Sequence, residues 1–443
     1  MRIQLQDHFT YKRLLRFVLS PVVMMVFTSL YSVVDGFFVS NFVGKTPFAA
    51  INLIMPITMG VGMVGFMIGT GGSAIVSKTL GEGNHKKANQ TFSLLIYTTI
   101  IVSLFLSVAG FIFIRPISAM LGATGALLED CTLYGGILFL SQSAFILQNV
   151  FQSFFVTAEK PALSLKISIA AGLTNILFDF LFIAVFQWGI AGAAIATAMG
   201  QIVGGFIPLC YFGRKNNSLL RLTKTTFDAK TLLKTFTNGS SEMVTNLSAS
   251  IINILYNFKL MEMAQENGVA AYGIIQYANF IFMAVFFGYS IGSAPIIGYH
   301  YGAGNHAELK NLFRKSLLLT GFTGVCMTLL AEILAKPVVA IFAGYDADLY
   351  TMTTNGFCLY ALAFSIMGIN VWGSAFFTAL SNGAVSAILS FLRTFVFQIA
   401  VLFTLPALLG INGIWLAIVV AELLALSVTI LFFVIKKKQY QYA

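Results

Sequence analysis

Long apolar segments recur along the whole chain, and a few polar, glycine or proline residues separate each one from the next. A helix of about 18 or more apolar residues can cross the hydrocarbon core of a bilayer, so this pattern is typical of transmembrane helices. Hydrophobic residues make up 58% of the 443 residues and charged residues 9%. A water-soluble globule cannot bury so much apolar surface. The chain is therefore predicted to be an integral membrane protein.

Twelve such segments can be distinguished. Uninterrupted apolar runs such as Leu94 to Ile114 lack the two-residue alternation of transmembrane β-strands, which favours helices. The predicted fold class is an all-α membrane protein with twelve transmembrane helices. Their expected ranges are 17–40, 48–77, 91–114, 133–157, 162–186, 189–212, 240–262, 270–298, 313–335, 353–379, 385–408 and 411–434.

The net charge of +10 could indicate a nucleic-acid partner, but its distribution favours another interpretation. If the N-terminus is cytoplasmic, 22 of the 26 Lys and Arg residues lie on the cytoplasmic side. Cytoplasmic loops of membrane proteins carry such an excess of positive charge. We therefore expect a multi-pass monomer in the plasma membrane, with both termini in the cytoplasm and no nucleic-acid partner.

The two halves of the chain repeat each other at a constant shift of 221 residues. The sequence GEGNH at 81–85 returns as GAGNH at 302–306, and each follows an even-numbered span of its half. Because six spans bring the chain back to the same side, the two halves should have the same orientation, as in many transporters. We expect a first lobe at 1–213, a cytoplasmic linker with a short basic amphipathic helix at 214–237, and a second lobe at 238–443.

Polar side chains that persist inside predicted spans call for a reason, because burying them in lipid is costly. Asp35 lies in the outer half of the first span, without a basic neighbour to neutralise it. Asn175 and Asp179, in the fifth span, are four residues apart and therefore share one helical face. Thr197 lies in the sixth span, where packing among small residues is an alternative role.

Asp35 and Asp179 fall at similar depths, and two carboxylates brought together in a low dielectric cannot both stay ionised without a bound cation or proton. All four candidate side chains offer oxygen, which suits either Na⁺ or a shared proton. The second half lacks the set, since the shift of 221 leads to residues of other types. These are Tyr256, Val396, Ala400 and Ile418. We expect the coupling site in the first half.

Of the charged residues in predicted spans of the second half, three could have a role inside the membrane. Glu242 begins the seventh span, where an interfacial acid at a helix start is an equally good explanation. Arg393 and Glu422 lie at depths that would permit a buried ion pair between neighbouring helices, a structural role. No HExxH, GxSxG, Walker A or Cys/His catalytic pattern occurs, so neither an enzyme nor a cofactor is indicated.

In its motifs and their order, the chain resembles the multidrug and toxic compound extrusion (MATE) family from the first span to the twelfth. The resemblance rests on Pro21 followed by LYSVVDGFFVSNFVG, and on a series of further motifs in the same order as in the family. These are AAINLIMP, GTGGSAIVSKTLGEGN, NILFDFLF, WGIAGAAIATAMGQ, VAAYGI and GSAPIIGYHYGAGN. The resemblance implies an exporter of lipophilic organic cations, driven by antiport of H⁺ or Na⁺.

The resemblance also implies roles for single residues. Asp35, Asn175, Asp179 and Thr197 match the family's cation or proton site, and Tyr31 matches a position near it. A substrate pocket would include Tyr31, Asp35, Asp179 and Glu242, and Pro21 would serve as a hinge for bending the first helix. The segment MGINVWGSAFF departs from relatives that carry an acid there, which puts a coupling site in the second lobe in doubt.

Two other functions remain open from the sequence. A flippase for lipid-linked precursors, from the same superfamily, would favour a strongly basic central cavity, whereas almost all basic residues here lie at cytoplasmic helix ends. A membrane scaffold would keep its function, without any ligand, after Asp35 is neutralised. Export driven by an ion gradient agrees best with the buried acids.

Overall fold

The computed structural model describes residues 3–43 and 45–443, except for the side chains of 32–37, 40, 41 and 45. This described part is helical throughout, without a strand. The first half contains α1 (Tyr11–Phe42), α2 (Lys45–Gly81), α3 (His85–Met120), α4 (Gly125–Thr157), α5 (Pro161–Asp179), the π-helix η1 (Phe180–Val185) and α6 (Gly189–Gly213). The second half contains α7 (Ala229–Gly302), α8 (His306–Ala343), α9 (Ala347–Ala361), α10 (Phe364–Ala379), α11 (Gly383–Phe391), η2 (Leu392–Val396), α12 (Phe397–Leu409) and α13 (Ile411–Tyr440).

The predicted all-α architecture with twelve spans is confirmed. Ten helices of the described chain are long and apolar enough to cross a membrane, and α9 with α10, bent by 48°, forms a further span. One of the ten, α7, has 74 residues, which at about 1.5 Å per residue is far longer than a bilayer is thick. It is kinked at Gln265, whose backbone has φ 54° and ψ −144°, and its two arms are the predicted seventh and eighth spans.

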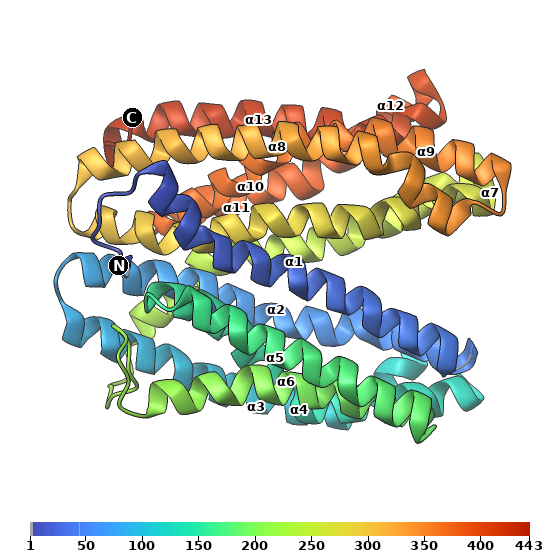
Figure 1. The fold of residues 1–443 in the computed structure, drawn as a ribbon, viewed down its shortest axis with the longest axis horizontal. Coiled ribbons are helices and arrows are strands. Elements are labelled where there is room, and N and C mark those ends of the chain that lie inside the picture. Colours follow the sequence, from blue (N-terminus) through green and yellow to red (C-terminus); the bar gives the residue numbers. More distant parts are fainter. Residues whose placement is uncertain (1–2, 44) are drawn as a thin grey trace.

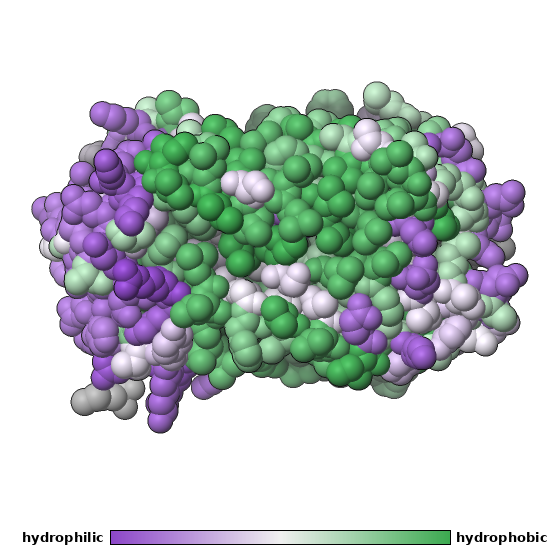
Figure 2. Space-filling model, turned by 90° about the horizontal axis from the view of Figure 1, so that it is seen from above, coloured by the Kyte–Doolittle hydropathy of each residue, from purple (hydrophilic) through white to green (hydrophobic). Residues whose placement is uncertain are grey.

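The two halves of the chain form two groups of helices that lie side by side (Figure 1). Both termini lie at the same end of the molecule, and we call this the basic end because the Lys and Arg residues of both tails and of the linker gather there. The opposite end is called the distal end. A broad hydrophobic band separates two hydrophilic ends (Figure 2), as expected of a protein that spans a bilayer.

The internal repeat is visible in the backbone. Gly83 and Gly304 both adopt a left-handed conformation, with φ of 77° and 66°, which glycine reaches without steric cost. Asn84 and Asn305 then cap the next helices, their side-chain oxygens accepting from backbone amides of the first turn at 3.0 and 3.1 Å. The repeated motif is therefore a turn that ends one span and begins the next.

Glycines bring the two groups of helices into close contact at the basic end. A Cβ atom on Gly81, at the end of α2, would lie 2.0 Å from the carbonyl oxygen of Tyr299 in α7. A Cβ atom on Gly302 would lie 2.0 Å from the carbonyl oxygen of Lys78 in α2. Gly81 and Gly302 are equivalent in the repeat, and so are Lys78 and Tyr299. The contact is therefore reciprocal, with the two halves related by an approximate twofold axis.

The segment before α1 crosses both groups of helices at the basic end. The Leu5 amide donates to Glu159 Oε1, just after α4, at 2.8 Å, and the Phe9 amide donates to Glu308 Oε1, in the first turn of α8, at 2.9 Å. His8 Nδ1 lies 2.6 Å from Glu308 Oε2. Leu5 and Phe9 are fully buried. We call residues 3–10 the N-terminal strap.

The linker differs in detail from the expectation. No separate helix forms between α6 and α7, and residues 229–237 continue directly into the span of α7. Residues 214–228 run along α3, where the Arg221 amide donates to Asn89 Oδ1 at 2.6 Å. Asp228 caps α7, and the hydrogen bond from the Thr231 hydroxyl holds the pKa of this carboxyl below its usual range.

Candidate functional site

The end of α5 carries two of the predicted polar side chains. Asn175 and Asp179 lie one turn apart and are buried, with 4% and 0% of their surface exposed. α5 ends at Asp179 and continues as the π-helix η1. π-helical turns within α-helices are often found at functional sites.

Glycines allow α1 and α6 to approach this part of α5. A Cβ atom on Gly172 would lie 3.0 Å from Tyr31 Cδ1 in α1. A Cβ atom on Gly200, in α6, would lie 3.0 Å from the Cβ atom of Asn175. Glycine at these two positions therefore lets three helices meet around Asn175.

A cavity of about 60 Å³ lies where these helices meet. Tyr31 of α1, Asn175 of α5 and Thr197 of α6 all line it, so three of the predicted residues come together. The remaining lining residues come from α2, α4, α5 and α6. They are Met55, Thr58, Met59, Tyr134, Leu138, Phe145, Gln148, Ala171, Gly200 and Gln201. The cavity has room for a few waters or one small cation, whereas pockets for drug-sized ligands measure roughly 300 Å³ or more.

Asn175 has an unusual environment in this cavity. Within the described part of the chain, neither its amide nitrogen nor its amide oxygen has a hydrogen-bond partner. Leaving a buried polar group unsatisfied costs about 1–3 kcal/mol. Such a group is therefore expected to face water or a bound ion. Thr197 differs, because its hydroxyl donates to the Ala193 carbonyl at 3.0 Å and keeps its lone pairs for another partner.

Neither of the two predicted aspartates is placed in this cavity by the structure. Asp179 is fully buried one turn beyond Asn175, but it is not among the residues that line the cavity. Asp35 belongs to α1, one turn after Tyr31, and its side chain lies outside the described residues. The predicted pairing of the two carboxylates therefore stays a prediction.

Sequence reasoning missed Gln148, Gln201 and Thr58, which also line the cavity. Gln201 accepts a hydrogen bond from the Ser141 hydroxyl at 2.6 Å. Each of these residues alone looks like a polar residue that joins transmembrane helices, a common role of Gln and Thr. The signal that could have found them is their number, since several amides within one half exceed what helix packing requires.

Glu242 does not join this cavity. It lies on α7, close enough to Arg393 of η2 for the two charges to interact. Arg393 Nη1 is 3.9 Å from Glu422 Oε1, so the predicted buried ion pair is confirmed. Asn370 Nδ2 also donates to Glu422 Oε2 at 2.7 Å. Arg393 is thus an internal cation that pairs with Glu422 and also interacts with Glu242.

Pro21, the predicted hinge, lies inside a continuous α1. Its carbonyl oxygen would lie 2.9 Å from a Cβ atom on Gly288 of α7. Pro21 therefore sits where α1 passes closely over the second half of the protein.

The model of the MatE family matches residues 21–181 and again residues 242–404. The chain belongs to the MatE family. This match confirms the family that the motifs indicated, and its double occurrence agrees with the internal repeat. MATE proteins are membrane transporters, so this one is not an enzyme.

Curated relatives of this MATE transporter cover nearly the whole chain. It is 24% identical to the multidrug export protein MepA of Staphylococcus haemolyticus, over 93% of this chain and 90% of MepA. It is 23% identical to MepA of Staphylococcus aureus strain MSSA476, over 97% and 94% of the two chains.

Solved MATE structures share its fold. A crystal structure of MATE in complex with MaL6 superposes with a TM-score of 0.93 at 20% identity, covering 98% of each chain. The outward-facing conformation of a multidrug resistance MATE family transporter gives a TM-score of 0.91 at 20% identity, covering 97% and 96%. At this level of identity the likeness concerns the fold.

Proposed function

We propose that this MATE transporter exports lipophilic organic cations in exchange for H⁺ or Na⁺. The observation that carries the proposal is the buried Asn175, with no hydrogen-bond partner in the described chain, one turn from the fully buried Asp179. Burial in a low dielectric disfavours the charged form of an acid, so a buried carboxylate tends to bind a proton or a cation. The multidrug export proteins among its relatives support the choice of substrate.

The small cavity would hold the coupling ion and not the drug. Tyr31, Asn175 and Thr197 offer a phenol, an amide and a hydroxyl, and oxygen atoms of this kind suit Na⁺ or a proton-sharing water. At about 60 Å³ the cavity excludes a drug-sized molecule. The substrate would bind elsewhere between the lobes, with Glu242 on the opposite lobe.

Export would proceed by alternating access of two lobes, at 1–213 and 238–443, joined by the linker at 214–237. The positive charge gathered at the basic end supports a cytoplasmic location of that end, with both termini inside. Because the glycine contacts described above join the lobes at this end, the conformation would then be closed to the cytoplasm.

Reconstituted vesicles test the proposal. The purified transporter is placed in proteoliposomes with a fluorescent organic cation, and a pH gradient or a Na⁺ gradient is imposed separately. We expect transport under one gradient and little under the other, which identifies the coupling ion. Transport that is equal with and without any gradient would contradict antiport. Stimulation by lipid-linked sugars, with no movement of the dye, would favour the flippase.

A further inference from the structure

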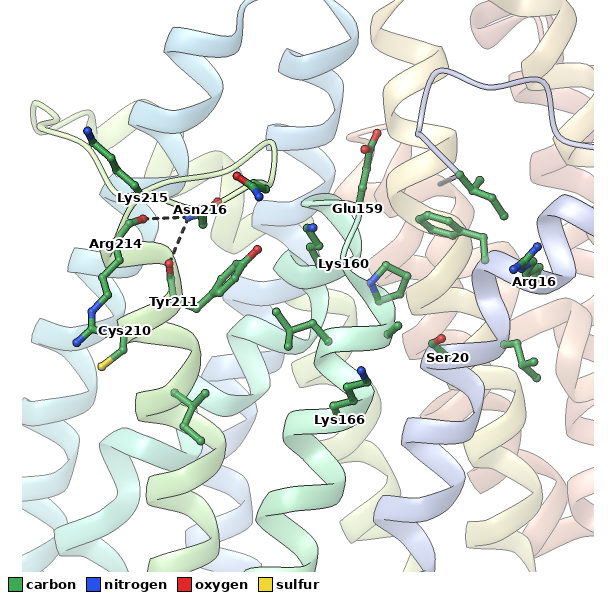
Figure 3. Close-up of a pocket in the computed structure, with 18 residues that line it drawn as sticks. Arg16, Ser20, Glu159, Lys160, Lys166, Cys210, Tyr211, Arg214, Lys215 and Asn216 are labelled. Carbon is green, nitrogen blue, oxygen red and sulfur yellow. Dashed lines mark hydrogen bonds between the residues drawn. The ribbon is translucent and has the colours of Figure 1, made fainter. Parts of the chain in front are cut away.

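A second and much larger cavity, of about 1130 Å³, opens at the basic end of the first half. It lies between the start of α1, the start of α5 and the end of α6 with the first linker residues (Figure 3). Five cationic side chains line it, and Glu159 is the one carboxylate among its lining residues. The cations are Arg16, Lys160, Lys166, Arg214 and Lys215. The cavity therefore carries a large excess of positive charge.

Four of the five cations of this cavity have no acidic partner among the described residues. These four are Arg16, Lys166, Arg214 and Lys215. Glu159 Oε1 already accepts the Leu5 amide of the N-terminal strap. Like charges around one hollow repel one another, so an anion bound there would relieve the repulsion.

The topology of the chain does not by itself require this cluster. The repeat places Thr237 at the position of Arg16, Ser381 at that of Lys160 and Ala387 at that of Lys166. Moreover, no charged residue occurs from 381 to 392, where α11 begins. The repeat does place a cation, Lys436, at the position of Lys215, so the two halves differ in the cations on α1 and at the start of α5. The cluster therefore has a local cause.

The cavity also has an apolar side. Leu19 of α1 and Ile207 of α6 line it and are 57% and 46% exposed. Further along α5 toward the distal end, Leu173 and Leu177 are 55% and 56% exposed, as expected of side chains that face lipid. Exposed apolar side chains thus continue from the basic groups of the cavity along α5 toward the distal end.

We propose that this cavity binds the phosphate headgroup of an anionic phospholipid from the adjacent leaflet, with the acyl chains lying along α1, α5 and α6. Lys and Arg near a membrane surface attract anionic lipids, and a guanidinium can hold a phosphate with two hydrogen bonds. An inorganic or soluble organic phosphate shares the headgroup's charge but cannot use Leu19 and Ile207. The apolar side therefore favours the lipid as the natural ligand.

Lipid titration tests this proposal. The transporter in neutral detergent is titrated with phosphatidylglycerol, and native mass spectrometry counts the lipids that stay bound. Lys160→Gln combined with Lys166→Gln removes two cations from the cavity. The control, Lys437→Gln with Lys438→Gln, removes two exposed cations from the last turn of α13, which also lies at the basic end of the protein. We expect the cavity variant to bind phosphatidylglycerol about tenfold more weakly or worse, with the control unchanged.

Further arms of the experiment separate the alternatives. If both variants lose the same affinity for phosphatidylglycerol, the proposal is overturned, because cations anywhere on the surface of the basic end would then contribute equally to binding. Inorganic phosphate and glycerol phosphate are titrated in the same way, and binding of these as tight as that of phosphatidylglycerol would mean a soluble anion site instead of a lipid site. Size-exclusion profiles and thermal unfolding in phosphatidylcholine show whether each variant is folded, and Arg16→Gln provides a second cavity variant if the first is not.

Discussion

Asp179 combines complete burial with a position at the junction of α5 and η1. Replacing it with Asn keeps the volume but removes the charge that would bind a proton or Na⁺. We expect Asp179→Asn to lower gradient-driven export of an organic cation by at least about tenfold, with normal membrane insertion. Asp348→Asn, at an exposed carboxylate of the distal end, serves as control. Unchanged dye efflux from proteoliposomes carrying Asp179→Asn would exclude this acid from coupling.

Asn175 and Asn370 are both buried in transmembrane helices, but their partners differ. Asn175 has none in the described chain, whereas Asn370 bonds to Glu422 and Thr429. We expect Asn175→Leu to leave thermal stability unchanged or raise it by about 1 kcal/mol, while export falls. Asn370→Leu should instead destabilise the fold by about 1–3 kcal/mol. Thermal unfolding and dye efflux of both variants distinguish a ligand from a structural amide, and the reverse order would refute the assignment.

At the scale of elements, the N-terminal strap joins the end of α4 to the start of α8. Glu308 accepts the Phe9 amide at 2.9 Å and lies 2.6 Å from His8 Nδ1. Asn311 and Lys315 of α8 add hydrogen bonds to the Phe9 carbonyl oxygen at 3.1 and 2.6 Å. Opening of the basic end has to break or stretch these contacts. The strap should therefore favour the closed state of this end.

Glu308→Ala tests the strap. Loss of a buried carboxylate that accepts several hydrogen bonds costs about 1–3 kcal/mol in the closed state, which corresponds to roughly a tenfold change in population. Spin labels on cysteines at the exposed positions Lys86 and Lys310 should show longer distances in this variant. Glu129→Ala, which breaks the exposed pair with Arg115 at the distal end, is the matched control. An unaltered distance distribution in Glu308→Ala would count against the strap.

At the scale of the whole molecule, the two halves meet through pseudo-symmetric glycines where a Cβ atom has no room. Gly302→Ala would place a methyl group 2.0 Å from the Lys78 carbonyl oxygen, so α2 and α7 would have to separate. We expect this variant to disfavour closure of the basic end and to lose most export. Gly273→Ala, on the same helix with nothing within 4 Å of the added atom, should transport normally. Equal export by the two variants, measured with dye in proteoliposomes, would argue that close contact is not needed.

The sequence by itself determined the features that follow from local composition and spacing. The bilayer sets the length of apolar segments, so the number and order of the spans could be predicted, although helices such as α3 and α8 extend beyond the expected ranges at both ends. The shift of 221 residues predicted the repeated Gly-Asn turns. The expected break between the seventh and eighth spans, at 263–269, contains the observed kink at Gln265, but the chain is helical on both sides of this single residue. The spacing of four residues between Asn175 and Asp179 predicted that both side chains lie on one face of the helix.

Tertiary structure alone decided which distant residues meet. Gln148 and Thr58 line the cavity with Asn175 because α2, α4 and α5 converge there, and no periodicity within one helix encodes such convergence. The same holds for the strap, since 154 residues separate Leu5 from Glu159, and for the basic cavity between α1, α5 and α6. Local patterns report how each helix meets lipid. Contacts between helices depend on the shapes of the packed surfaces. The need for glycine at a position is therefore visible only when the backbone of the opposing helix is known.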